Sequence, residues 1–223
     1  SQADIEDKEL DSHMNDIYFT LENGEKFIIA TTRPELIPAC VAVFVHPEDE
    51  RYQNLIGKTA KTALFNVKVP ILADEIVAKD KGSGIVMCCT FGDMNDVLWW
   101  KKHQLESRVI LNKYGKIKEI DQGLENSLKE NCDLENFNAI YQEFIGKNVK
   151  QARSLILEKL AAENFLIEQK AISHPVKCAE RSGAPIEIML TKQWFVKILH
   201  KKQELLEPVS YTHLTLPTNV QVL

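Results

Sequence analysis

Alternating apolar and polar positions dominate the first half of the chain and predict a strand-rich region. Residues 17–21 and 26–30 are rich in strand-forming side chains, and Asn23-Gly24 between them favours a tight turn, so we predict a β-hairpin. Pro34 denies the backbone a donor and is expected to end the second strand. Short apolar runs predict further strands at residues 41–45, 67–72, 85–89 and 109–111, and a helix is predicted at residues 93–103.

A helix is also the clearest prediction in the second half of the chain. Its apolar positions recur at spacings of three and four, as one helical face requires: Val149, Ala152, Ile156 and Leu160. Asn148 is a suitable N-cap for it. The polar stretch 119–138 gives no clear assignment, and strand-like pieces return at residues 175–176, 186–190 and 194–198. These patterns together indicate an α+β fold.

Composition narrows the class of protein. Hydrophobic residues make up 44% and charged residues 26% of the 223 residues, as in ordinary globular proteins. The net charge of −5 argues against a protein that coats nucleic acid, although it leaves room for a local basic groove. No apolar run is long enough to cross a membrane, and the acidic start does not resemble a signal peptide. The five cysteines include no C-x-x-C pair, which argues against a disulfide framework or a four-ligand zinc site. We therefore expect reduced cysteines and a cytoplasmic location.

Two polar clusters are the candidates for chemistry. Thr31, Thr32 and Arg33 follow a predicted strand, and Asp93 and Asp96 open a predicted helix, where a spacing of three places both carboxylates on one face. Such carboxylates can capture a cationic amine or orient a water molecule. Structural roles are equally open, since Asp93 is a good N-cap, Asp96 complements the helix dipole, and Arg33 can form a surface ion pair. For any one of these residues alone, the structural role is the favoured explanation.

The motif Thr31-Thr32-Arg33-Pro34-Glu35 resembles the inserted editing domain, connective peptide 1, of class I aminoacyl-tRNA synthetases. The enzymes for valine, isoleucine and leucine share this insert. Further motifs, which resemble the valine branch best, occur in the same order at residues 46–52, 55–58, 70–75, 82–87 and 193–196. The resemblance covers roughly residues 10–206.

The resemblance implies a fold and a domain organisation. We expect a β-barrel-like editing core decorated by α-helices, with residues 1–206 forming the editing domain. The barrel core is expected at about residues 15–118, and a helical and return segment at about 139–206. Residues 207–223 include an uncharged stretch without helical period, and we interpret them as an added or disordered tail.

The resemblance also implies an activity, the hydrolysis of threonine from mischarged valine tRNA and of threonyl-adenylate. Threonine and valine are nearly isosteric, so a hydrophobic synthetic pocket cannot strongly reject the hydroxyl, and a second site has to remove it. Asp93 is expected to hold the substrate amino group as the catalytic residue, and Asp96 to recognise the threonine hydroxyl. The pocket is expected to be lined by Thr31, Thr32, Arg33, Met87 and Cys89, with water as the nucleophile.

Four positions depart from the pattern that is common in the valine branch. Met87 replaces a lysine, Cys89 a threonine, Gly92 a histidine and Leu36 a threonine, which leaves the hydroxyl-recognition network open. Neither a metal nor a cofactor is expected. The His-Ile-Gly-His and Lys-Met-Ser-Lys-Ser signatures of the synthetic site are absent, so we expect no use of ATP and no amino acid activation.

The expected partners are the 3′ acceptor end of valine tRNA, bound weakly, and a threonyl ester. No membrane is expected to take part, and the chain is expected to be a monomer. Two alternatives stay open: an acceptor-end binding module without hydrolysis, and the editing domain of an isoleucyl- or leucyl-tRNA synthetase.

Overall fold

A computed structural model of the chain describes residues 5–190. Ser1–Met189 forms one compact unit, and the fold described below is that of this unit. The predictions for residues 193–206 and for the tail 207–223 lie outside the described residues. Among the helices of the described part, none combines the length and the apolar character that a membrane crossing requires.

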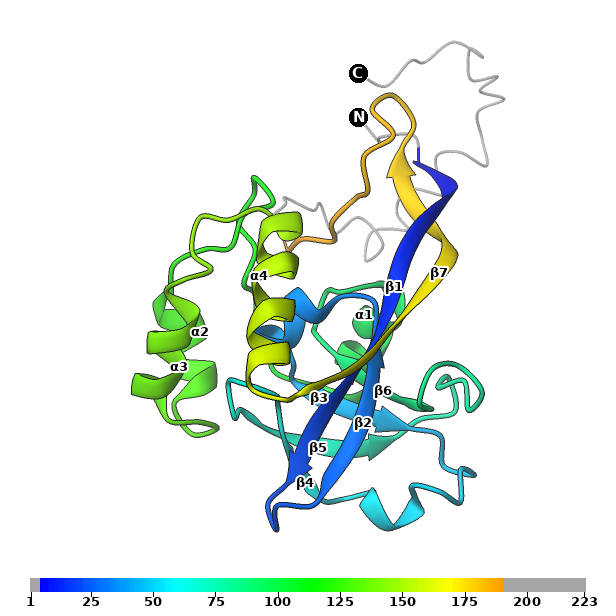
Figure 1. The fold of residues 1–223 in the computed structure, drawn as a ribbon, viewed down its shortest axis with the longest axis vertical. Helices are drawn as coiled ribbons and strands as arrows, with labels where there is room; N and C mark the ends of the chain where they lie inside the picture. Colours follow the sequence, from blue (N-terminus) through cyan, green and yellow to red (C-terminus); the bar gives the residue numbers. More distant parts are fainter. Residues whose placement is uncertain (1–4, 191–223) are drawn as a thin grey trace, which may run out of the picture. The chain divides into compact units, whose positions relative to one another are not determined.

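Seven strands in the described part of the chain form one sheet (Figure 1). The predicted hairpin is confirmed: β1 (Ile5–Leu21) and β2 (Lys26–Thr31) pair antiparallel on either side of the turn at Asn23-Gly24. The other strands are β3 (Ala42–Val45), β4 (Thr59–Lys61), β5 (Lys68–Ala73), β6 (Ile85–Cys88) and β7 (Leu166–Ala179). The strand order is β2-β1-β4-β5-β3-β6, with β7 paired to β1, and among these seven described strands only the pair β3–β5 is parallel.

The expected α+β class is confirmed, and the sheet is open rather than a closed barrel. Its two ends, β2 and β6, approach within 8 Å between Cα atoms but form no ladder among the described residues. β6 has only four residues, so its free edge offers little backbone for a ladder with β2. This near closure brings the end of β2 close to β6.

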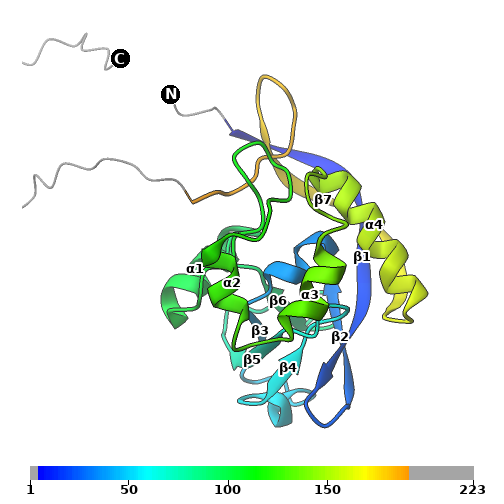
Figure 2. The ribbon, with the colours of Figure 1, turned by 90° about the vertical axis from the view of Figure 1, so that its left-hand side faces the viewer.

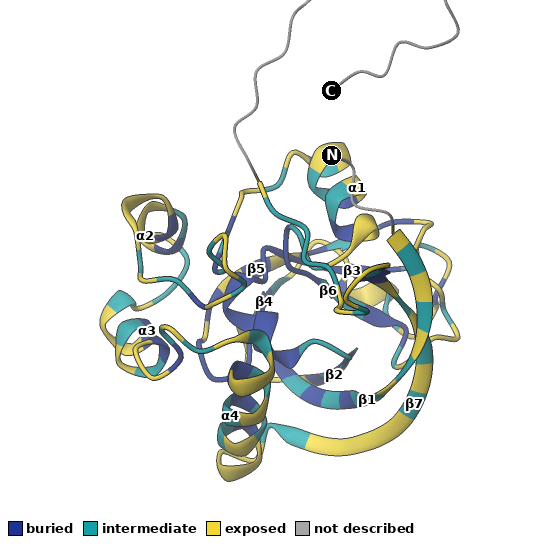
Figure 3. Ribbon diagram, turned by 90° about the horizontal axis from the view of Figure 1, so that it is seen from above, coloured by how far each residue is buried: buried dark blue, intermediate teal, exposed yellow. Residues whose placement is uncertain are grey.

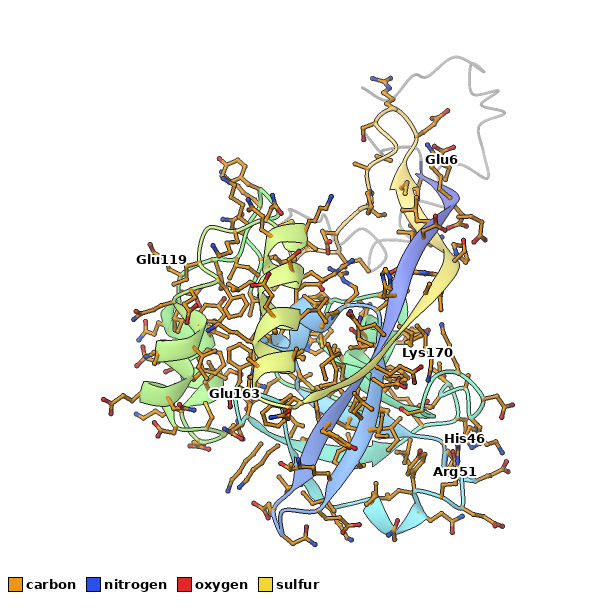
Figure 4. All side chains as sticks on the ribbon, viewed as in Figure 1. Glu6, His46, Arg51, Glu119, Glu163 and Lys170 are labelled. Carbon is orange, nitrogen blue, oxygen red and sulfur yellow. The ribbon has the colours of Figure 1, made fainter. Side chains whose placement is uncertain are left out.

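The first strand is much longer than predicted. β1 and β7 pair from Ile5↔Ala179 to Ile17↔Leu166 and form a two-stranded ribbon. Most of β7 is exposed (Figure 3), and Figure 4 shows Glu6 toward the outer end of the ribbon and Lys170 nearer the sheet. The prediction missed this part because its polar and charged residues leave no clear apolar face to detect.

In residues 5–190, four α-helices and two short 3-10 helices accompany the sheet (Figure 2). They are α1 (Met94–His103), α2 (Gln122–Leu128), α3 (Leu134–Tyr141) and α4 (Val149–Ala162), with η1 (Pro34–Ala39) and η2 (Gln53–Leu55). The predicted helices α1 and α4 are confirmed, and Asn148 forms a capping box with Gln151. α2 and the first five residues of α3 lie in the polar stretch 119–138, for which the sequence gives no clear assignment.

The strands predicted at residues 109–111 and 186–190 are wrong. In the first segment only the isolated bridge Leu111↔Ile117 forms, and next to the second only Cys178↔Pro185. Each segment makes only isolated backbone contacts: Ile110 O accepts from Lys118 N at 2.9 Å, and Ile186 N donates to Lys177 O of β7 at 3.0 Å. No regular ladder forms there among the described residues.

A small apolar cluster fixes α1 on the sheet. Trp99 of α1 is buried and stacks on Phe44 of β3 with 4.6 Å between ring centroids, together with Val41, Ala42, Val77 and Cys88. The position of α1, and of the residues at its start, is therefore set by packing against β3 and β6.

Candidate functional site

The end of β2 forms one side of the candidate site. Thr31 is buried, and its carbonyl accepts a hydrogen bond from Asn15 Nδ2 at 3.0 Å. Its Oγ1 accepts from the backbone amide of Arg33 at 3.0 Å, which turns the chain before η1 begins at Pro34. Thr32, between them, is half-buried. The predicted polar cluster therefore lies at a sharply turned strand end.

The start of α1 forms the other side. Asp93 is the N-cap, and its Oδ1 accepts from the backbone amide of Asp96 at 2.9 Å, so the capping role is confirmed. Asp93 is exposed, whereas Asp96 is only 6% exposed. The Oδ2 atom of Asp96 accepts from the amides of Cys89 at 3.1 Å and Gly92 at 3.0 Å. One carboxylate of the pair thus faces outward, and the other holds the loop between β6 and α1.

Gly92 allows this loop to approach Asp96 closely. A Cβ atom at Gly92 would overlap Asp96 Oδ2 and lie 3.2 Å from Leu36 Cδ1. Gly92 and Leu36 are two of the four positions that depart from the pattern common in the valine branch. In the structure, these two positions are in contact with each other. Glycine is required here because Asp96 and Leu36 occupy the space that a side chain would need.

Arg33 joins the two sides of the site. Its Nη1 donates to the carbonyl of Gly92 at 2.8 Å, directly before Asp93. Its Nε donates to Glu35 at 3.1 Å and its Nη2 to Glu187 at 2.7 Å. The end of β2 and the start of α1 are therefore connected by one guanidinium group.

Burial changes the protonation of two groups of the site, Asp96 and Cys89. Burial, with a smaller contribution from the charge of Asp93, raises the pKa of Asp96 to about 7, although the amides of Cys89 and Gly92 favour the ionised form. Asp96 therefore titrates near neutral pH. Burial also raises the pKa of the Cys89 thiol well above its ordinary value, so Cys89 is a neutral thiol.

The remaining predicted residues lie nearby with less defined roles. Met87 is half-buried in β6 and pairs with Val43, and Cys89 lines a crevice of about 30 Å³, room for about one water molecule. The crevice is lined by Leu36, Ala39, Cys89, Phe91, Arg108, Val109, Ile110, Leu111, Glu187, Ile188 and Met189. Within residues 5–190, no group of three or more His, Cys, Asp or Glu side chains is arranged to hold a metal ion.

Sequence reasoning missed the partners of Arg33. The side chain of Glu35 is fully buried and also accepts from Arg153 of α4, at 2.8 and 2.7 Å. Glu35 lies inside the recognised motif, so its charge two residues from Arg33 was a usable signal. Arg153 and Glu187 are more than a hundred residues away from Arg33 in the sequence, and no local pattern marks them.

Comparison with known proteins places this sequence among relatives. No protein-family model matches the chain. The valine–tRNA ligase of Rickettsia rickettsii (strain Sheila Smith) is 51% identical over 207 residues, which are 93% of this chain and 23% of that protein. The valine–tRNA ligase of Ehrlichia canis (strain Jake) is 48% identical over 211 residues, 94% of this chain and 25% of that protein. The chain thus spans about a quarter of the length of the curated relatives it matches.

The chain is therefore homologous to part of an aminoacyl-tRNA synthetase. The particular synthetases that it matches at about half identity are valine–tRNA ligases, and the resemblance to that branch is confirmed.

Proposed function

We propose that this chain is an editing domain of a valine–tRNA ligase, which hydrolyses threonine from mischarged valine tRNA. The hydrogen bond from Arg33 Nη1 to the Gly92 carbonyl, 2.8 Å long, carries the proposal. It ties the threonine pair at the end of β2 to the aspartate pair at the start of α1, in a chain that is half identical to valine–tRNA ligases.

The exposed carboxylate of Asp93 suits the ammonium group of an aminoacyl ester. Asp93 has no ion-pair partner among the described residues, and the cap uses its Oδ1, so it can bind a cation without giving up a salt bridge. With the amino group held there, a water molecule attacks the ester carbonyl. The bond to the ribose oxygen of the terminal adenosine then breaks, and threonine leaves as the free acid.

The buried carboxyl group of Asp96 suits selection for a hydroxyl. A pKa of about 7 makes both protonation states available, and either state can share a hydrogen bond with the threonine hydroxyl. Valine offers a methyl group at the same place and would leave a buried polar group without its partner, which costs about 1–3 kcal/mol. This difference favours threonine over valine at the second site.

Asparagine at position 93 gives a sharp test because it caps helices as well as aspartate but carries no charge. We expect Asp93→Asn to slow the release of threonine from threonyl-tRNA(Val) roughly tenfold to a hundredfold, since a charge-assisted contact is lost. Asp11→Asn, an exposed change on the β1–β7 ribbon, is the matched control. Release at the uncatalysed rate by the wild type and both variants would refute hydrolysis, and acceptor-end binding that persists would then favour a binding module.

A further inference from the structure

Four side chains of alternating charge form a continuous ion-pair network beside the site: Arg153, Glu35, Arg33 and Glu187. They come from α4, from η1, from the turn before η1, and from the segment that follows β7. That segment turns at the outer end of the ribbon and runs back toward the helices (Figure 1). It is anchored near Glu187 by the hydrogen bond from Ile186 N to Lys177 O, 3.0 Å long.

The ion-pair network needs Glu187 to balance the charge of its two arginines. Glu35 is fully buried and is shared by two guanidinium groups, those of Arg33 and Arg153. Those two cations repel each other across a single carboxylate. Glu187, with 2.7 Å between its Oε2 and Arg33 Nη2, supplies the second negative charge. Without it, two partly buried arginines would share one acid.

Geometry adds a second requirement. A guanidinium group is planar and donates in fixed directions. The three nitrogens of Arg33 each have a different partner, namely Glu35, the Gly92 carbonyl and Glu187. Glu187 is the partner on Nη2, on the side of the group away from the chain stem. Its loss leaves the plane of the group free to turn away from the Gly92 carbonyl.

The Gly92 peptide lies at the centre of the site loop and is held from two sides. Its amide donates to Asp96 Oδ2 at 3.0 Å, and its carbonyl accepts from Arg33 Nη1 at 2.8 Å. Asp93 is the next residue, and its backbone conformation begins α1. The direction of the Asp93 side chain therefore depends on both hydrogen bonds of Gly92.

We infer that Glu187 is a positioning residue of this site: by holding Arg33, it fixes the Gly92 peptide and thereby the direction in which α1 presents Asp93. Glu187 contacts Arg33 and acts on Asp93 only through it. The inference rests on the proposed function for its catalytic consequence, but the structural consequence is independent of any activity.

Hydrogen exchange of the full 223-residue chain tests the structural consequence. The amides of Gly92 and Asp96 are both hydrogen-bonded in the loop, so peptides that span residues 90–96 report on it. We expect Glu187→Ala to accelerate exchange there about tenfold or more, and Glu187→Gln, which keeps an acceptor, to accelerate it less. Glu180→Gln, an exposed change in the turn after β7, is the matched control and should leave exchange unchanged. The β1–β2 ladder serves as the internal reference for global unfolding.

Deacylation kinetics test the catalytic consequence. Asp93 holds the substrate ammonium group in the proposed function, so its misplacement in Glu187→Ala should lower kcat/KM for threonyl-tRNA(Val) roughly tenfold to a hundredfold. Glu187→Gln should restore part of the rate. Should Glu187→Ala fail to fold, Glu187→Gln compared with Glu180→Gln provides the same two measurements.

Two results would overturn the inference. Exchange at residues 90–96 that matches the wild type in both Glu187 variants would show that Glu187 does not hold the loop. A lower KM with an undiminished kcat would show that Glu187 only occupies the place of a substrate anion. Accelerated exchange in a chain whose wild type does not hydrolyse threonyl-tRNA would instead refute the proposed function and leave the positioning role intact.

Discussion

Replacing Asp96 by asparagine should stabilise the fold at alkaline pH, because Asp96 is buried and its ionisation is disfavoured. Burial, together with the nearby charge of Asp93, raises the pKa of Asp96 to about 7. The Oδ1 atom of asparagine can still accept from the amides of Cys89 and Gly92, which Asp96 Oδ2 accepts from now. The substitution therefore removes the titrating charge and keeps the hydrogen bonds of the loop.

The pKa values set both the sign and the size of the effect. Between the ordinary value of 3.8 and about 7, the folded protein binds a proton at Asp96 that the unfolded chain has lost. Stability therefore falls as the pH rises through this window. A pKa difference of this size corresponds to at most about 4 kcal/mol. The free energy of unfolding of Asp96→Asn should accordingly exceed that of the wild type by an amount that grows by up to about 4 kcal/mol from pH 4 to pH 8.

Urea unfolding followed by tryptophan fluorescence measures this difference, since the buried Trp99 stacks on Phe44 and reports on packing near α1. The wild type and the variant are compared at each pH, so that contributions from all other titrating groups cancel. A difference that stays constant between pH 4 and pH 8, or that moves in favour of the wild type, would refute the reasoning. The same variant should also lose part of its preference for threonyl- over valyl-tRNA if Asp96 selects the hydroxyl.

Three further predictions concern neighbouring contacts. Glu35→Gln should lower the free energy of unfolding by about 3 kcal/mol in urea titrations, because two arginines lose their buried carboxylate. Burial tends to raise the pKa of Asp74, but hydrogen bonds from Lys102 and His103 outweigh it and hold this pKa below its ordinary value. Asp74→Asn should therefore be destabilising at pH 7, and its difference from the wild type should narrow as the pH falls below about 4. Gly92→Ala should cost about 1–3 kcal/mol by overpacking, and Leu36→Thr should recover part of this cost in a double-mutant cycle.

Helix caps and turns of this fold were predictable, because the residue type that indicates them in the sequence is the one that makes the hydrogen bond or the turn. Asn148 caps α4, and Asp93 caps α1, because a cap bonds to amides two or three residues away. The turn at Asn23-Gly24 and the end of β2 before Pro34 follow from backbone chemistry in the same way. By contrast, the sequence gives no clear assignment for α2 and most of α3, because their short, mostly polar sequences show little periodicity.

Pairing between distant segments could not be predicted from local patterns. The outer part of β1 is recognisable as a strand only from its ladder with β7, whose paired residues lie more than 150 positions away in the sequence. Likewise, Arg33 and Asp93 were recognised as site residues, but their link runs through the Gly92 carbonyl, which carries no signal in the sequence. Glu187 joins the same network across 154 positions. A single sequence names candidates for a site, whereas the bonds that orient them depend on the complete fold.

Asp93 and Asp96 can stabilise the fold and also bind substrate. In each carboxylate, one oxygen atom makes the structural hydrogen bonds, which leaves the other oxygen for substrate. Asp93 caps α1 through Oδ1, and this bond holds an exposed carboxylate at one position at the helix start. Asp96 holds the loop through Oδ2, and the burial that this requires is what raises its pKa toward neutrality. Natural proteins commonly accept such a loss of stability at functional sites. An Asp96→Asn chain that is more stable at pH 8 yet discriminates poorly would show that the strain of a buried carboxylate and its selectivity have the same origin.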